Sequence, residues 1–203
     1  VGEALPESLL LSPPEFSGAH DPHVWFDVRM WRRGVDPVAE LLARLDPASA
    51  GEYRERAGAY AAELVRLHDE AATALAAIPP TQRVLITAHD AFHYFGRAYG
   101  LEVRGLQGIS TAVEAGTADV QDLAAYIAER RIPAIFLESS VSPRAIEAVR
   151  AAVRARGFDV HVGGTLYSDA LGDEGTPAGT YAGMVRHNVA TIAAALRGGG
   201  GDA

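Results

Sequence analysis

The sequence predicts an α/β protein in which helices flank a parallel sheet, together with one unusually long helix. After residue 83, short apolar runs alternate with segments of helical periodicity, which indicates a parallel sheet with helices on both faces. Residues 47–78 carry one apolar stripe at steps of three and four. An unbroken helix over that range would be about 48 Å long, more than a small domain spans. We therefore expect it to run along two lobes or to link them.

Composition narrows the class of protein. The chain has 203 residues, of which 48% are hydrophobic and 22% charged, as in ordinary globular proteins. A net charge of -8 argues against nucleic acid or an anionic membrane as a partner. There is no cysteine, which excludes disulfides and thiolate metal sites. The start has no signal-peptide pattern, and because it is Val and not Met, we expect a processed or trimmed product with missing upstream sequence.

In the first half of the chain, prolines mark the predicted turns and the predicted ends of helices. Residues 1–20 are predicted to form a loop with a possible short strand, followed by Asp21-Pro22-His23. Pro22 fixes its own φ and restricts Asp21 to extended geometry, so His23 is presented from a defined turn. Asp36-Pro37 then predicts the start of a short helix over 37–45, and Asp46-Pro47 predicts the start of the long helix. Pro79-Pro80 marks the end of the long helix.

In the second half of the chain, predicted strands alternate with predicted helices. Strands are expected at 83–87, 102–107, 134–138 and 158–162, and helices at 90–99, 118–131, 143–156 and 177–196. The glycine-rich tail from Gly198 is expected to be disordered.

Three polar residues follow predicted strands at their carboxyl ends, namely His89, Glu138 and Asp169. Because these ends meet at one edge of a parallel sheet, the three side chains are expected to converge there. Glu138 ends a buried strand, where a carboxylate needs a partner charge, hydrogen bonds or a metal. With His23, the set suits zinc, manganese or iron(II). Taken singly, each histidine could instead be a capping or core residue, and Asp169 a plain loop cap.

The other histidines are weaker candidates. His93, one helical turn after His89, is expected at the rim of the site or behind a ligand, and His20 in a loop. His68 in the long helix, His161 in a strand and His187 in the last helix are read as structural or solvent-exposed.

Several segments, in this order, carry a family resemblance: Asp-Pro-His-Val-Trp-Phe-Asp at 21–27, Ala-His-Asp-Ala-Phe at 88–92 with Tyr-Phe-Gly at 94–96, Gln-Gly-Ile-Ser-Thr at 107–111, Phe-Leu-Glu-Ser-Ser-Val-Ser at 136–142, Gly-Thr-Leu-Tyr-Ser-Asp at 164–169, and Gly-Met-Val-Arg-His-Asn at 183–188. Together they resemble the metal-binding solute-binding proteins of ABC transporters, the zinc/manganese (TroA/ZnuA-like) family. The resemblance covers nearly the whole chain from Asp21 to Leu196.

The resemblance implies a two-lobed solute-binding fold with a helical backbone and a metal held between the lobes. The implied parts are a remnant of the N-terminal lobe at 1–45, a long linker helix at 46–79, a C-terminal α/β lobe at 80–197 and a disordered tail at 198–203. It assigns ligand roles to His23, His89 and Asp169 and places Glu138 beside the site. The family's first ligand, a His before the Asp-Pro-His turn, has no counterpart here. The chain is then either a fragment or a shortened relative.

The implied function is capture of a divalent transition metal outside the cytoplasm, in the periplasm or on a lipid anchor, and delivery to an ABC transporter permease by a monomeric binding protein. The resemblance favours Zn²⁺, because manganese-selective relatives tend to carry Glu at the position of His89. Asp169 is also compatible with Mn²⁺, and Fe²⁺ is a further possibility. A second hypothesis is a metal-dependent hydrolase with Glu138 as general base, although no His-Glu-x-x-His motif is present. A third is an α/β domain with structural histidines and no metal.

Overall fold

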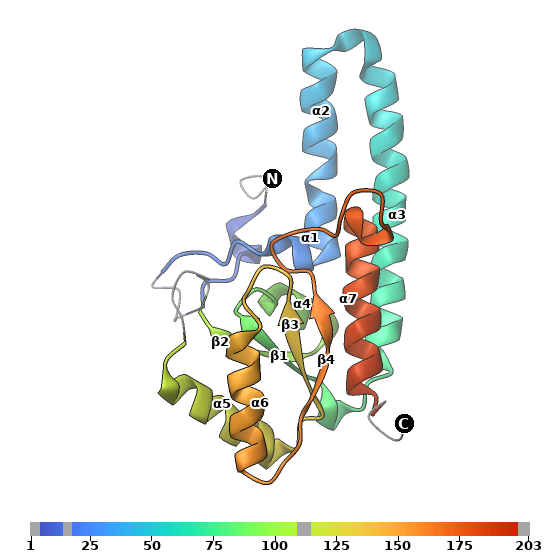
Figure 1. Cartoon of the computed structure of the whole chain (residues 1–203). Helices are drawn as coiled ribbons and strands as arrows, with labels where there is room; N and C mark the ends of the chain where they lie inside the picture. Colours follow the sequence, from blue (N-terminus) through green and yellow to red (C-terminus); the bar gives the residue numbers. More distant parts are fainter. Residues whose placement is uncertain (1–4, 14–17, 109–114, 199–203) are drawn as a thin grey trace.

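The structure, a computed structural model, describes residues 5–13, 18–108 and 115–198 (Figure 1). Its helices and strands are, in chain order, η2 (Glu7–Leu9), η4 (Val24–Phe26), α1 (Val28–Arg33), α2 (Val35–Leu45), η5 (Pro47–Ser49), α3 (Ala50–Ala76), η6 (Pro80–Gln82), β1 (Val84–His89), α4 (His93–Tyr99), β2 (Glu102–Gln107), α5 (Thr117–Arg130), β3 (Ala134–Glu138), α6 (Arg144–Ala155), β4 (His161–Leu166), η7 (Pro177–Gly179) and α7 (Tyr181–Leu196), where η marks a 3-10 turn. Within these residues, no helix is long and apolar enough to cross a membrane.

The four strands are parallel within two hydrogen-bonded pairs, β1 with β2 and β3 with β4. β1 also lies beside β3, so the strands form one layer in the order β2, β1, β3, β4 (Figure 1). Their carboxyl ends therefore lie at the same edge of the layer.

Both faces of this layer are covered, as the sequence predicts. In β1, Leu85 packs into a core shared with α3, α4 and α7, whereas its neighbours Val84 and Ile86 pack against α5 and α6. β3 alternates in the same way, with Phe136 on the first side and Ile135 on the second. Strands buried on both faces explain the near-continuous apolar runs in the sequence.

The long helix is slightly shorter than expected. The sequence predicts an unbroken helix from Pro47 to Ile78, but a 3-10 turn occupies 47–49 and α3 covers Ala50–Ala76, about 40 Å at 1.5 Å per residue. The second half of α3 buries four side chains and packs against α7, while the first half pairs mainly with α2 in a hairpin that projects from the body (Figure 1).

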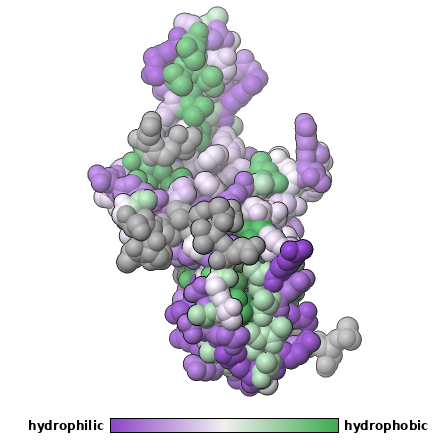
Figure 2. All heavy atoms as spheres, turned by 60° about the vertical axis from the view of Figure 1, so that its left-hand side comes forward, coloured by the Kyte–Doolittle hydropathy of each residue, from purple (hydrophilic) through white to green (hydrophobic). Residues whose placement is uncertain are grey.

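This α2–α3 hairpin exposes apolar side chains. Val38, Leu41, Leu42 and Leu45, all on α2, are each at least 39% exposed. Figure 2 shows hydrophobic atoms gathered along the hairpin at the top of the view. We call these four residues the hairpin face.

The fourth strand starts later than predicted. The sequence favours 158–162, whereas β4 covers His161–Leu166, because its register pairs His161 with Ala134 at the start of β3. Glycine usually weakens a strand, but here it permits close packing. A Cβ at Gly163 would lie 2.6 Å from the Cβ of Ala195 in α7.

Two helix starts also differ from prediction, and one helix was not predicted. The last helix, expected from residue 177, begins at Tyr181 because Thr180 is extended and its side chain accepts the Gly183 N–H. α4 begins at His93 and not at 90, after a turn in which the Ala91 N–H donates to the His89 carbonyl. α1 was not predicted.

Some sequence-based expectations fall outside the described residues. These are the glycine tail from residue 199 onward and residues 109–111 of one resembling segment.

Candidate metal centre

The first candidate ligand, His23, is oriented by Asp21. The Asp21 Oδ1 atom accepts the His23 backbone N–H at 2.9 Å and lies 2.7 Å from His23 Nδ1. Burial raises the pKa of Asp21, but hydrogen bonds from His23 and His93 outweigh it and hold that pKa below its ordinary value. An ionised carboxylate only accepts hydrogen bonds, so His23 Nδ1 carries the proton. His23 Nε2 is therefore left with its lone pair available to a metal.

The second candidate ligand, His89, has the same arrangement. Its side chain is fully buried at the end of β1, and its Nδ1 lies 2.6 Å from Glu138 Oε2. The other oxygen, Glu138 Oε1, accepts the His89 backbone N–H at 2.9 Å. Burial alone lowers the pKa of His89, but the hydrogen bond and charge of Glu138, helped by Asp169 and Asp90, place it above its ordinary value.

Asp169 faces both imidazoles. Its Oδ1 lies 3.6 Å from His23 Nε2, and its Oδ2 lies 3.4 Å from His89 Nε2. One ligand atom from each of the three residues can be chosen so that all lie within 4.8 Å of one another. Ligands of a tetrahedral zinc ion with bonds of about 2.0–2.1 Å are themselves roughly 3.3 Å apart. The arrangement therefore fits a small metal ion with little movement.

One feature of His89 supports this fit. Its Nε2 is buried and makes no hydrogen bond of good geometry in the described part of the chain, where its polar contact is Asp169 Oδ2 at 3.4 Å. A buried polar atom without a partner destabilises the folded state unless something else binds it. A metal ion on Nε2 would remove that cost, and two imidazoles with a carboxylate suit zinc, manganese or iron(II).

The predicted residues thus take two kinds of position. The structure brings His23, His89 and Asp169 together. Glu138 lies behind His89, since both of its oxygens contact that residue and its side chain is fully buried. Sequence reasoning treated Asp21 only as part of a turn. Its position two residues before His23, where an aspartate commonly accepts a local N–H, could have shown its role.

The remaining histidines lie elsewhere. Their positions are His20 beside Ser12, His68 against Tyr99, His161 at the start of β4, and His187 against the Thr165 carbonyl. His93 is nearer the site, with its Nδ1 3.4 Å from Asp21 Oδ2 and its Nε2 3.8 Å from Asp90 Oδ1.

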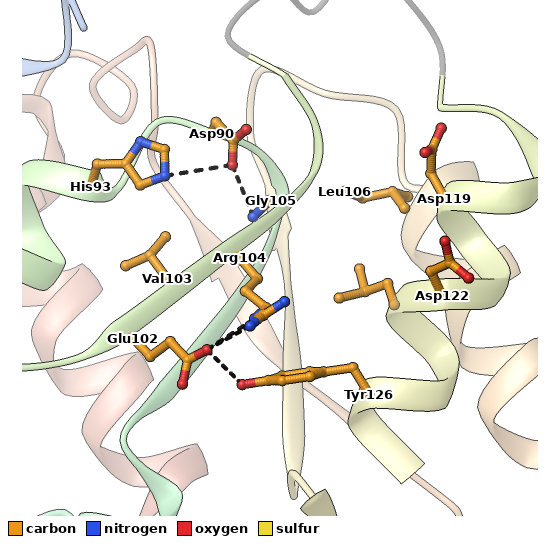
Figure 3. Close-up of a pocket in the computed structure, with 11 residues that line it drawn as sticks. Asp90, His93, Glu102, Val103, Arg104, Gly105, Leu106, Asp119, Asp122 and Tyr126 are labelled. Atoms are coloured by element: carbon orange, nitrogen blue, oxygen red, sulfur yellow. Dashed lines mark hydrogen bonds and ion pairs between the residues drawn. The ribbon is translucent and has the colours of Figure 1, made fainter. Parts of the chain in front are cut away.

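A hollow of about 480 Å³ between β2 and α5 adjoins the site but is distinct from it (Figure 3). None of the three converging residues lines it. Its charged groups are largely paired: Glu102 contacts Arg104 and Tyr126, and the Asp90 carboxylate accepts the Gly105 N–H at 3.0 Å. Among the described residues, Asp90 and His93 are the lining residues that lie near the candidate metal centre.

Comparison with known proteins places these residues in a wider group. The family described as zinc-uptake complex component A periplasmic (ZnuA) matches residues 3–195. The zinc-binding protein TroA of Treponema pallidum is 52% identical over 196 residues, which cover 97% of this chain and 63% of TroA. The manganese-binding lipoprotein MntA of Bacillus subtilis is 44% identical over 197 residues, which cover 97% of this chain and 64% of MntA.

The solved structures agree with this grouping. The structure of the periplasmic zinc-binding protein TroA from Treponema pallidum superposes with a TM-score of 0.92, covering 96% of this chain and 69% of that one. This chain therefore spans less than two thirds of the length of the curated relatives just described.

Proposed function

Because the chain belongs to the ZnuA family of periplasmic zinc-uptake components, we propose that it binds one divalent transition metal through His23, His89 and Asp169. The metal is cargo, captured outside the cytoplasm and delivered to the permease of an ABC-type importer. Zinc is favoured and manganese or iron(II) is possible.

One observation carries this proposal: two imidazole Nε2 atoms and a carboxylate face one point, and each imidazole has a carboxylate at its Nδ1. Such carboxylates fix the tautomer and orientation of metal-binding histidines and raise their basicity. The names of the relatives support the class of cargo, because TroA is named for zinc and MntA for manganese.

The position of Glu138 argues for a binder over a hydrolase. A general base must reach the proton of a metal-bound water. Both Glu138 oxygens instead contact His89, and the side chain is fully buried. We therefore assign Glu138, like Asp21, the role of positioning a ligand histidine.

The three ligands leave one position of a four-coordinate ion open. The relatives extend beyond the part that matches this chain, and we propose that a segment equivalent to that unmatched part supplies the fourth ligand. The same segment would cover the hairpin face of this chain, whose exposed apolar side chains are otherwise unusual. On this proposal, residues 1–45 belong to an N-terminal lobe, 46–79 link the lobes and 80–197 form the C-terminal lobe of a monomer.

The proposal is tested by calorimetric titration of the metal-free chain with zinc, manganese and iron(II), with elemental analysis of the protein as purified. We expect one metal per chain, and an affinity at least about tenfold lower for His89→Ala. The matched control is His161→Ala, at the opposite end of the sheet, which should bind like the wild type. Absence of binding by the wild type, or equal affinities for the two variants, would contradict the proposal.

A further inference from the structure

Asp169 differs from the two histidines in how it is held. Its side chain is 38% exposed, against 4% for His23 and 0% for His89. Within the described residues, the polar contacts of its carboxylate are those with the two imidazoles. Among the described residues no other side chain orients this carboxylate, so we infer its position from the backbone that carries it.

That backbone is fixed immediately before Asp169. The Ser168 carbonyl accepts the indole N–H of Trp25 at 3.2 Å, and the Ser168 hydroxyl lies 2.5 Å from that of Ser140. One residue earlier, Asn188 of α7 holds Tyr167 by accepting its N–H and donating to its carbonyl. The Trp25 contact comes from the turn η4, which begins directly after His23.

Trp25 is itself held on both sides. Its carbonyl accepts the Tyr181 hydroxyl at 2.7 Å, so its backbone is tied to the start of α7. Its ring meets the His23 ring edge to face, with centroids 5.2 Å apart. A single side chain thus touches one proposed ligand and holds the backbone next to another.

We propose that Trp25 is a positioning residue that sets the Asp169 carboxylate opposite His23 and His89, and so limits the rate of metal release. This inference rests on the proposed function. A bound metal must lose its ligands one at a time. In the part of the chain that the structure describes, Asp169 is the exposed ligand and the one with no carboxylate behind it. Release therefore begins with movement of Asp169, which the Trp25–Ser168 hydrogen bond resists.

The test replaces Trp25 by Phe, which keeps an aromatic ring beside His23 but removes the N–H donor. Zinc release from the full chain is followed by stopped-flow transfer to a chromophoric chelator. We expect Trp25→Phe to release zinc roughly three- to tenfold faster, the effect of one hydrogen bond. Trp31→Phe is the matched control, because it removes an indole N–H that is donated to Tyr60 at 3.2 Å and not to the backbone beside Asp169. Its ring stacks on Tyr181, a contact that phenylalanine can keep, so this variant should release zinc at the wild-type rate.

A double-mutant cycle separates positioning of Asp169 from a general structural effect. In an Asp169→Ala background, Trp25→Phe should leave the release rate unchanged. Equal acceleration in both backgrounds would mean that Trp25 acts through His23 and would overturn the inference. A wild-type rate for Trp25→Phe alone would also overturn it.

A second measurement covers the case in which Trp25→Phe does not fold. The chain has two tryptophans, so Trp31→Phe leaves a single indole N–H signal, that of Trp25, in the NMR spectrum. We expect solvent exchange of this proton to slow when zinc is added, and an unchanged exchange rate would overturn the inference. If the wild type binds no zinc, the proposed function fails as well, whereas zinc binding without these Trp25 effects contradicts only the inference.

Discussion

At the scale of single residues, His23 and His89 each have a carboxylate beside Nδ1, but the two carboxylates come from different parts of the fold. Asp21 reaches His23 from two positions earlier in the same turn, whereas Glu138 reaches His89 from a neighbouring strand. Both carboxylates contact Nδ1, which leaves each Nε2 free to face the proposed metal position. If the proposed metal site is correct, its histidines are oriented by acidic residues, Asp21 and Glu138, that contact the ring nitrogens opposite the proposed metal position.

The substitution Glu138→Gln tests this dependence. An amide in place of the carboxylate loses the charge and can donate to Nδ1, which would favour the tautomer with a proton on Nε2. We expect zinc affinity to fall about 10- to 100-fold by calorimetric titration. Glu102→Gln, which alters a surface ion pair with Arg104 and Arg130, should bind zinc as the wild type does. Unchanged affinity in Glu138→Gln would remove Glu138 from the site.

At the scale of elements, the loop between β4 and α7 carries Asp169 and depends on tight packing at the start of α7. A Cβ at Gly183 would lie 1.6 Å from the Pro177 carbonyl oxygen. Glycine at this position lets the 3-10 turn η7 fold back against α7, and the Gly172 N–H then donates to the Ala178 carbonyl within the same loop. The loop geometry is thus set by backbone contacts that a side chain would block.

We therefore expect Gly183→Ala to lower the free energy of unfolding by about 1–3 kcal/mol or more, measured by urea denaturation. Gly51→Ala, the same change in α3 with nothing within 4 Å of the added Cβ, should raise it by about 0.5–1 kcal/mol. Equal effects of the two substitutions would show that the contact with Pro177 does not constrain the loop.

The sequence predicts most elements because their signals are local. Apolar runs mark β1 and β3, and the apolar stripe of α3 identifies its buried face. β4 was misplaced because its start depends on pairing with Ala134 and on close packing of Gly163 against α7. These are contacts between distant residues, which no local pattern contains.

The candidate site also has features that the sequence predicts and features that depend on contacts between distant residues. Convergence of His89 and Asp169 follows from topology, since His89 ends one parallel strand and Asp169 follows another at the same edge. The contact of both Glu138 oxygens with His89 depends on how β1 and β3 lie against each other, so the sequence could not distinguish a ligand from a residue behind one. Trp25 gave no signal beyond membership of the Asp-Pro-His-Val-Trp segment.

At the scale of the whole molecule, the centre exists only when distant parts of the chain are folded together. His23 lies before the long helix α3, His89 ends the first strand after it, and Asp169 follows the last strand. Residues 24–30 share one hydrophobic core with α3, α4 and α7, which holds the His23 turn against the sheet edge. The proposed metal binding at these three residues therefore requires the packing of all these segments together and not any one of them alone.

The most direct test of the central claim is the position of the metal in crystals of the zinc-loaded chain, located by anomalous scattering at the zinc edge. Our account predicts one strong peak about 2.0–2.2 Å from His23 Nε2, His89 Nε2 and an Asp169 oxygen, with Asp21 and Glu138 still contacting the Nδ1 atoms. A peak bound elsewhere, or one coordinated by Glu138 in place of Asp169, would contradict it.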